Sequence, residues 1–310
     1  MPRTLFQRIA IITVVITILM AACSRIQNNQ GDRAEVFPPL DPTISTQEAR
    51  LVFGDQSAPN AGDSRVIGFY SNGCLSGAQM LPENGPTWQA MRLSRNRNWG
   101  HPELIDYLQN LSRQVASQTS WNGLYIGDMA QPRGGPMLTG HVSHQSGLDA
   151  DIWMLPPGRL DLSRAERENL SSISTRSARG ARVGTNWTAE HMQVLRMAAR
   201  DPRVARIFVF TGAKVWMCDN ETGDRSYLRN IRPANGHHYH FHIRLHCPSG
   251  SPDCDEQTPV PPGDGCDEAR ARAERILNPP PPDPNYTPPP PRAPLTLGDL
   301  PRACVGLLNQ

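Results

Sequence analysis

The sequence predicts an α+β fold whose helices and strands are joined by long loops. Apolar residues recur at helical spacing between His101 and Gln118, whereas the segments Leu148–Met154 and Gly236–His246 alternate apolar and polar residues, as half-buried strands do. The chain has 310 residues with 30 prolines and 25 glycines, which favours much loop and turn. This length permits one large domain with tails.

Residues 1–22 are expected to be an export signal that is removed. Two arginines and no acid accompany an apolar run, Ile9–Met20, that is too short to span a bilayer. The run leads into Leu-Met-Ala-Ala-Cys at 19–23, which resembles a bacterial lipobox with Cys23 as the lipidated new N-terminus. The alternative is ordinary cleavage after residue 22, which would leave Cys23 as a spare thiol.

Residues 23–60 are polar and rich in Asn, Gln, Asp and Pro, which predicts a lipid-anchored or flexible tether. The folded domain is therefore expected at 61–310. Without the first 22 residues, which hold two of the 31 basic side chains, 29 bases face 29 acids. No basic field for nucleic acid remains. The sequence does not indicate an oligomeric state.

Helix and strand periodicities continue along the expected domain. Leu104, Leu108 and Leu111 lie on one side of the first helix, and Ser163 with Glu166 resembles a capping box. Five further elements are expected: a short strand at 124–128, a helix at 188–200, a buried strand at 207–210, a helix at 267–277 and a polyproline spacer at 278–294.

Seven cysteines in an exported protein leave one without a partner, and Cys23 is the natural one. No CxxC pair is present, so disulfides are expected rather than a structural zinc site. The other six permit 15 pairings; they are Cys74, Cys218, Cys247, Cys254, Cys266 and Cys304. Since Cys304 lies beyond the spacer, the C-terminus is expected to return and be stapled to the domain.

Five of the nine histidines lie between His237 and His246. If this segment is a strand, its period of two places polar side chains on one face and apolar side chains on the other. The two sets are His238, His240, His242 and Arg244 against Tyr239, Phe241, Ile243 and Leu245. One face is thus expected to be buried and the other to be a wall of histidines.

The other alternating segment places Asp149 and Asp151 on one face, and Gly147 lets His144 fold back towards Asp151. If the two strands are neighbours, imidazoles and a carboxylate meet, which is the ligand mixture of a catalytic zinc with an open position. Neither HExxH nor GxSxG is present, so the common protease templates do not compete. Asp149, which is off the motif spacing, is expected to support the fold.

His144-x6-Asp151 followed by His240-x-His242 is similar to the ligand pattern of the LAS metallopeptidases. From about residue 70 to 304, the chain more closely resembles the family of penicillin-insensitive murein endopeptidases. The motifs that carry this likeness are SNGCLSGAQMLP at 71–82, GHPELI at 100–105, IGDM at 126–129, GHVSHQSGLDADIW at 140–153 and HFHIRLHCP at 240–248.

The resemblance implies a central antiparallel sheet that carries a zinc site, with flanking helices and loops stapled by disulfides. It implies a periplasmic enzyme that cleaves the D-alanyl–diaminopimelyl bridge between peptidoglycan strands. By position in the motifs, it assigns Zn²⁺ to His144, Asp151, His242 and His141, and catalysis to His240 and His237. For His141 and His237, direct metal contact and orientation of neighbouring ligands remain alternatives.

The resemblance also suggests the disulfides Cys74–Cys304, Cys218–Cys266 and Cys247–Cys254. The family's further metal position has no counterpart, because no His or Asp lies between residues 171 and 187. Ser24 stands where an Asp is associated with inner-membrane retention, so a lipid anchor at Cys23 would favour the outer membrane.

Two other function classes stay open. One is an exported zinc D,D- or L,D-carboxypeptidase, which would trim a peptide stem without opening a cross-link. The other is a lipoprotein that binds peptidoglycan without cleaving it. In an endopeptidase or a carboxypeptidase, zinc would lower the pKa of its bound water towards ~7. His240 would take a proton or stabilise the oxyanion, and Arg133 and Arg244 are candidate partners for stem carboxylates.

Overall fold

The computed structural model describes residues 39–309, and the chain from Leu40 onward forms one compact unit. The expected export signal, Cys23 and the first part of the expected tether lie outside the described residues. Within residues 39–309, no helix is long and apolar enough to cross a membrane.

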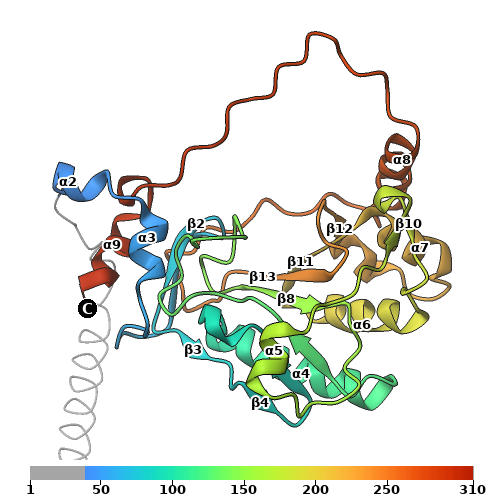
Figure 1. Cartoon of the computed structure of the whole chain (residues 1–310), viewed down its shortest axis with the longest axis horizontal. Coiled ribbons are helices and arrows are strands. Elements are labelled where there is room, and N and C mark those ends of the chain that lie inside the picture. Colours follow the sequence, from blue (N-terminus) through green and yellow to red (C-terminus); the bar gives the residue numbers. More distant parts are fainter. Residues whose placement is uncertain (1–38, 310) are drawn as a thin grey trace, which may run out of the picture. The chain divides into compact units, whose positions relative to one another are not determined.

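A seven-stranded mixed sheet forms the centre of this unit (Figure 1). The strand order is β12 (Ile231–Pro233), β11 (Val204–Val209), β13 (His240–Leu245), β8 (Asp149–Trp153), β7 (Leu124–Ile126), β5 (Trp88–Ala90) and β4 (Asn84–Gly85). Within the row β11, β13, β8 and β7, each strand is antiparallel to the next, whereas β12 pairs in parallel with β11 and β5 pairs in parallel with β7. The expected antiparallel sheet is therefore confirmed at its centre.

One face of the central strands is covered by two helices, α4 (Pro102–Gln118) and α6 (Ala189–Arg200). The largest hydrophobic core lies between these helices and the strands. It contains Leu104, Leu108, Leu111, Ala150, Ile152, Val194, Leu195, Phe241 and Ile243. Because side chains alternate along a strand, burial of this apolar set turns the histidines and aspartates of the same strands to the opposite face.

The remaining elements surround the sheet. The helices are α2 (Pro42–Ser45), α3 (Ala49–Gly54), α5 (Arg164–Asn169), α7 (Thr211–Asn220), α8 (Cys266–Leu277) and α9 (Arg302–Gly306). The short strands are β1 (Arg65–Phe69), β2 (Asn72–Ser76), β3 (Gln79–Met80), β6 (Trp99–Gly100), β9 (Arg176–Ser177) and β10 (Arg182–Val183). The 3₁₀ helices are η1 (Leu93–Arg95), η2 (Ala178–Gly180), η3 (Ser226–Asn230), η4 (Leu297–Asp299) and η5 (Leu307–Asn309).

The helices and strands expected from periodicity are present with small shifts at their ends, and Ser163 with Glu166 forms the predicted capping box. One shift matters for the site. Strand β13 begins at His240, so His238 precedes the strand and is not part of its polar face. Its buried ring instead pairs with the Ser174 hydroxyl, at 3.1 Å from Nδ1 to Oγ.

The segment expected to be a tether up to residue 60 is folded from about residue 40. Helix α3 buries Ala49 and Phe53 completely in a small second core that also contains Cys74 and Cys304. Ala49 and Phe53 lie four residues apart in the sequence and therefore share one face of the helix. Because the surrounding segment is polar, its composition does not indicate that this short apolar stripe is folded.

All three suggested disulfides are present: Cys74–Cys304, Cys218–Cys266 and Cys247–Cys254. The first joins β2 to α9 and returns the C-terminal segment to the domain, as expected. The spacer at 278–294 contains neither helix nor strand and is exposed throughout. It extends from α8 to the C-terminal elements (Figure 1).

Candidate metal centre and active site

The register of β8 against β13 brings the two motifs together. Asp151 lies opposite His242, and Asp149 lies opposite Arg244, in antiparallel neighbours. All four side chains therefore lie on the sheet face turned away from α4 and α6. This grouping is the one that alternation in the sequence predicted.

His144 reaches the same place from the loop before β8. Its backbone has a φ of +68°, and that of Gly147 has a φ of +75°. A Cβ atom at Gly147 would lie 2.3 Å from Leu75 Cδ2, so only glycine fits this turn. The His144 N–H donates to Asp149 Oδ2 at 3.0 Å, which fixes the left-handed conformation. The expected hinge thus carries the fully buried His144 ring to the sheet face.

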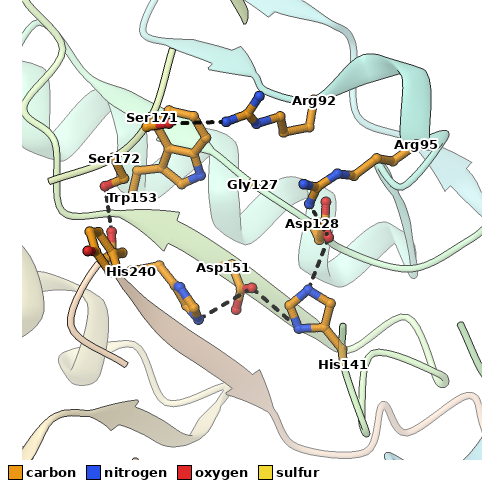
Figure 2. A pocket seen from close by; sticks show the side chains of 11 residues that line it. Arg92, Arg95, Gly127, Asp128, His141, Asp151, Trp153, Ser171, Ser172 and His240 are labelled. Carbon is orange, nitrogen blue, oxygen red and sulfur yellow. Dashed lines mark hydrogen bonds and ion pairs between the residues drawn. The ribbon is translucent and has the colours of Figure 1, made fainter. Parts of the chain in front are cut away.

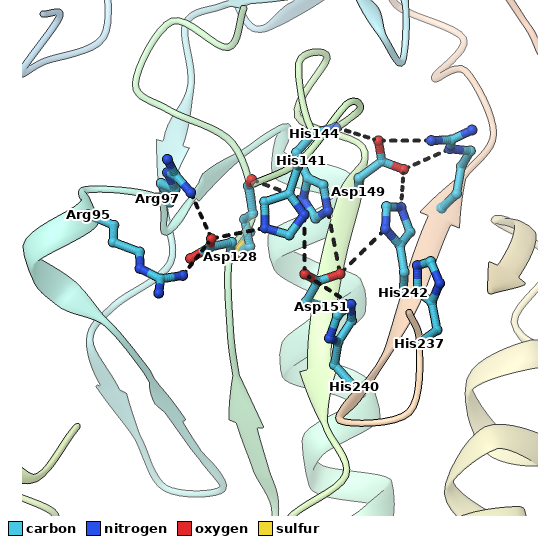
Figure 3. A network of polar contacts seen from close by, with 12 residues as sticks. Arg95, Arg97, Asp128, His141, His144, Asp149, Asp151, His237, His240 and His242 are labelled. Atoms are coloured by element: carbon cyan, nitrogen blue, oxygen red, sulfur yellow. Dashed lines mark hydrogen bonds and ion pairs between the residues drawn. The ribbon is translucent and has the colours of Figure 1, made fainter. Parts of the chain in front are cut away.

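Four imidazoles surround the carboxylate of Asp151 (Figure 3). His144 Nε2 and His242 Nδ1 each lie 3.4 Å from Oδ1. On the other oxygen, Oδ2, His141 Nδ1 lies at 3.6 Å and His240 Nε2 at 3.5 Å. Asp151 and His242 are both only 4% exposed, so this cluster is shielded from water on most sides.

The other nitrogen of three of these rings is held by the protein. His144 Nδ1 lies 3.1 Å from the Met129 carbonyl, which can only accept, so Nδ1 carries the proton and Nε2 the lone pair. His242 Nε2 lies 2.9 Å from Asp149 Oδ1, and His141 Nε2 lies 3.0 Å from an oxygen of Asp128. Such partners orient metal-binding histidines and fix their tautomers.

These residues fit a metal ion. The potential ligand atoms of His141, His144 and Asp151 all lie within 4.8 Å of one another. His242 is outside that set but offers Nδ1 to the same carboxylate. Among the described residues, the buried atoms His144 Nε2 and Asp151 Oδ1 have no hydrogen-bond partner. Because such atoms are costly to bury, a cation between them would supply the missing partner.

The charges in the cluster also favour a cation. Burial opposes ionisation of Asp151, but His240 and His144 outweigh it and hold the pKa of that carboxyl well below its usual range. Burial likewise opposes the His144 charge, yet Asp151 and Asp149 raise the pKa of that ring. Burial lowers the pKa of His242, which keeps it neutral as a ligand must be.

Asp149 does more than support the fold. Its carboxylate accepts a hydrogen bond from the His144 N–H and contacts His242 Nε2 through Oδ1. It also binds Arg244, whose Nε lies 2.7 Å from Oδ1. Burial raises its pKa, but Arg244 and His242 lower it to far below the usual range. The sequence did signal this role, because Asp149 shares the face of Asp151 in the alternating segment.

Asp128 and two arginines form a second layer of contacts behind His141; Asp128 lies in the IGDM motif, but the sequence assigned no role to any of the three. Asp128 lies just beyond β7 and binds His141, Arg95 at 3.0 Å and Arg97 at 2.9 Å. Burial opposes its charge, but His141 and the arginines lower its pKa to about 2. These partners come from separate loops, so no spacing in the chain reveals them.

His240 and His237 take different positions. His240 lines the cavity described below, whereas His237 does not. The His237 ring lies 5.2 Å from that of His240, and its Nδ1 donates to the Asn235 carbonyl at 2.7 Å. Burial, with His240 and His242 adding to it, lowers the pKa of His237 to about 4. It is therefore a neutral neighbour of the cluster.

A cavity of about 410 Å³ opens onto the cluster (Figure 2). It is lined by Arg92, Arg95, Gly127, Asp128, His141, Asp151, Trp153, Ser171, Ser172, Tyr239 and His240. The expected carboxylate partners Arg133 and Arg244 are not among these residues. Arg244 is buried on Asp149, and Arg133 donates to the Leu307 carbonyl. The arginines at the cavity are instead Arg92 and Arg95.

A buried cluster of histidines and a carboxylate beside an open cavity defines the class of a metal-dependent hydrolase. The comparisons with known proteins specify this class. A family model described as "Penicillin-insensitive murein endopeptidase" matches residues 66–309, and the chain belongs to this family.

Curated relatives with the same name support this assignment. The protein of Haemophilus influenzae is 44% identical over 206 residues, which cover 66% of this chain and 71% of the relative. That of Klebsiella pneumoniae subsp. pneumoniae is 39% identical over 254 residues, covering 81% and 89%. That of Yersinia pestis bv. Antiqua is 40% identical over 255 residues, covering 81% and 88%.

Proposed function

We propose that this protein is a zinc-dependent endopeptidase that hydrolyses D-alanyl–meso-diaminopimelyl cross-links in peptidoglycan. The observation that carries the proposal is the convergence of four imidazoles on the buried Asp151 carboxylate beside an open cavity. Membership of a family named for murein endopeptidase activity supplies the substrate class.

The proposed metal ligands are His144, Asp151 and His242, with His141 as a further ligand. Neutral imidazoles and one carboxylate form the donor set that zinc prefers in hydrolases. When bound, zinc would supply Lewis-acid chemistry that polarises a carbonyl oxygen and makes water a nucleophile near neutral pH.

His240 is the proposed proton-transfer residue. Its side chain is 27% exposed and borders the cavity, with Nε2 3.5 Å from Asp151 Oδ2. A ring in this position can take a proton from attacking water at Nε2 and give it to the leaving amine. His237 is proposed to assist as a neutral imidazole whose Nδ1 proton is held by Asn235.

The proposed location is the periplasm, with Cys23 as the proposed site of an outer-membrane lipid anchor. Three disulfides are typical of proteins that fold in an oxidising compartment. The expected export signal at 1–22 agrees with this location. In that compartment, the cavity would receive extended peptide stems of the cell wall.

A digestion of cross-linked muropeptides tests the proposal. Purified protein with zinc should convert peptide-bridged dimers to monomers. A carboxypeptidase would release D-alanine and leave dimers intact, and a binding protein would release nothing. Asp151→Asn is the matched control: it should abolish cleavage while thermal unfolding shows that the protein is folded. Intact dimers after digestion with the zinc-loaded wild type would refute the endopeptidase.

A further inference from the structure

The cavity has a cationic side that the proposed metal site does not explain. Figure 2 shows Arg92 and Arg95 along one side, and Asp151, His141 and His240 along the other. On the cationic side, the Asp128 carboxylate is paired with both Arg95 and Arg97. Three guanidinium groups, with Arg92 as the third, face two carboxylates there, Asp128 and Glu168, so this side retains a positive charge.

The backbone around Arg92 is held in an uncommon conformation. Arg92 and Asn96, which flank η1, have φ values of +57° and +51°, in the left-handed region that few non-glycine residues adopt. The turn is tied to helix α5, because Glu168 accepts hydrogen bonds from the Ser94 N–H at 2.7 Å and from its hydroxyl at 2.9 Å. This turn places the Arg92 side chain over the cavity.

The guanidinium of Arg92 has few partners of its own. It lies 5.8 Å from the centre of the Trp153 ring and 3.5 Å from the Ser171 hydroxyl, which is at the limit of a hydrogen bond. Within residues 39–309, it forms no ion pair; the Glu168 carboxylate interacts with the Arg92 charge at longer range, and both of its oxygens accept hydrogen bonds from Ser94. Most of its five N–H donors therefore remain available to a ligand.

We propose that Arg92 is a specificity-determining residue that binds a free carboxylate of the substrate next to the scissile amide. The proposal rests on the proposed function. In a D-alanyl–meso-diaminopimelyl bridge, the amide nitrogen is attached to a carbon that also carries a carboxylate. Asp151 and His240 line the same cavity as Arg92 and Arg95, so an amide bound at the former would have its neighbouring carboxylate in a cavity whose other side is cationic. An arginine binds a carboxylate through two parallel hydrogen bonds, and the Trp153 ring supports the guanidinium plane.

The test compares two cross-linked dimers that differ only in this carboxylate, one free and one converted to the amide. Wild-type protein should cleave the free acid with a kcat/KM about tenfold to a hundredfold higher, the range expected for a charge-assisted hydrogen bond. Arg92→Ala should lose that preference by slowing the free acid alone, and Arg92→Lys should keep part of it. Equal slowing on both dimers, or an unchanged preference, would overturn the proposal.

Arg164→Ala is the matched control. Arg164 lies on α5 near the same turn, is 68% exposed and pairs with Glu83 outside the cavity. Its removal takes the same charge from the protein and should leave the preference unchanged. A similar loss of preference in this variant would assign the effect to net charge and overturn the role of Arg92.

A binding measurement separates this proposal from the proposed function. In the His240→Ala background, calorimetry should show tighter binding of the free-acid dimer than of the amidated dimer. Addition of Arg92→Ala should make the two affinities equal. If the wild type cleaves neither dimer, the endopeptidase is refuted while this binding comparison still decides for or against Arg92. Equal affinities before Arg92 is changed would overturn the carboxylate site.

Discussion

Replacement of Asp149 by asparagine should damage both stability and metal binding, although Asp149 is not a proposed ligand. Its fully buried carboxylate accepts from the His144 N–H at 3.0 Å, meets His242 Nε2 at 2.9 Å and binds Arg244 at 2.7 and 3.3 Å. Asparagine has a similar shape, but it replaces one acceptor by an NH₂ donor and removes the negative charge.

The magnitude follows from Arg244. Arg244 is only 6% exposed. Its guanidinium lies 4.2 Å from the centre of the Tyr70 ring and 5.3 Å from that of the Phe208 ring. In Asp149→Asn its charge keeps only neutral acceptors, which are the remaining side-chain oxygen at position 149 and that of Gln257 at 3.0 Å. Loss of one partner of a buried ion pair costs about 3–5 kcal/mol. Loss of the partner that orients a ligand histidine costs about 10–100-fold in metal affinity.

Urea unfolding of the metal-free protein and a zinc titration against a competing chelator measure the two effects separately. Asp149→Asn with Arg244→Gln removes both charges, so its loss of stability should be smaller than the sum of the single losses. Zinc affinity should remain low in the double variant because His242 still lacks its orienting carboxylate. Asp161→Asn, at an aspartate whose side chain is 80% exposed, is the surface control. An Asp149→Asn protein within about 1 kcal/mol of wild type and with unchanged zinc affinity would refute this reasoning.

Three further outcomes are expected. A chelator should abolish dimer cleavage and stoichiometric zinc should restore it, while penicillin should not inhibit; full activity in excess chelator would reject a zinc enzyme. His242→Ala should lose zinc and activity, whereas His240→Ala should retain zinc, measured by elemental analysis, and lose turnover about 10²–10⁴-fold; the reverse pattern would exchange their roles. The buried His191 accepts the Thr188 N–H at Nδ1 (3.0 Å) and is held neutral, because burial lowers its pKa. The unfolded chain binds that proton near pH ~6.5, so the free energy of unfolding should fall as pH drops below this value. His191→Gln should reduce this dependence in urea melts at pH 7 and 5.5, and an unchanged dependence would contradict it.

Periodicity predicted the fold well because each central element buries one face. The apolar stripe of α4 and the alternation in β8 and β13 are local patterns, and burial follows from them directly. Where burial depends on distant partners, the sequence was less informative. Phe53 is buried because the chain returns at Cys304, whereas the short stripe in a polar segment predicts a tether when it is considered alone.

The same distinction applies to the site. His144, Asp151 and His242 come from two dense motifs whose spacing carries their grouping. Asp128, although it lies in the IGDM segment, and Arg97 belong to neither dense motif, because Asp128 meets His141 and Arg97 only through the folding of separate loops. The sequence could also not distinguish the arginines. Arg244 lies on the histidine strand, but its guanidinium is paired with Asp149. Arg92 is positioned by a left-handed turn that no composition rule predicts.

Alternation also leaves the register of β8 and β13 undecided. A slip of one residue would expose the apolar face, but a slip of two residues keeps that face buried and would place Asp149 opposite His242. The Arg244 guanidinium would then face Gly147 and lose its carboxylate. Leaving that buried charge unpaired costs about 3–5 kcal/mol, which is enough to exclude the slipped register at equilibrium. The buried ion pair between Asp149 and Arg244 therefore selects the register in which Asp151, rather than Asp149, lies directly opposite His242.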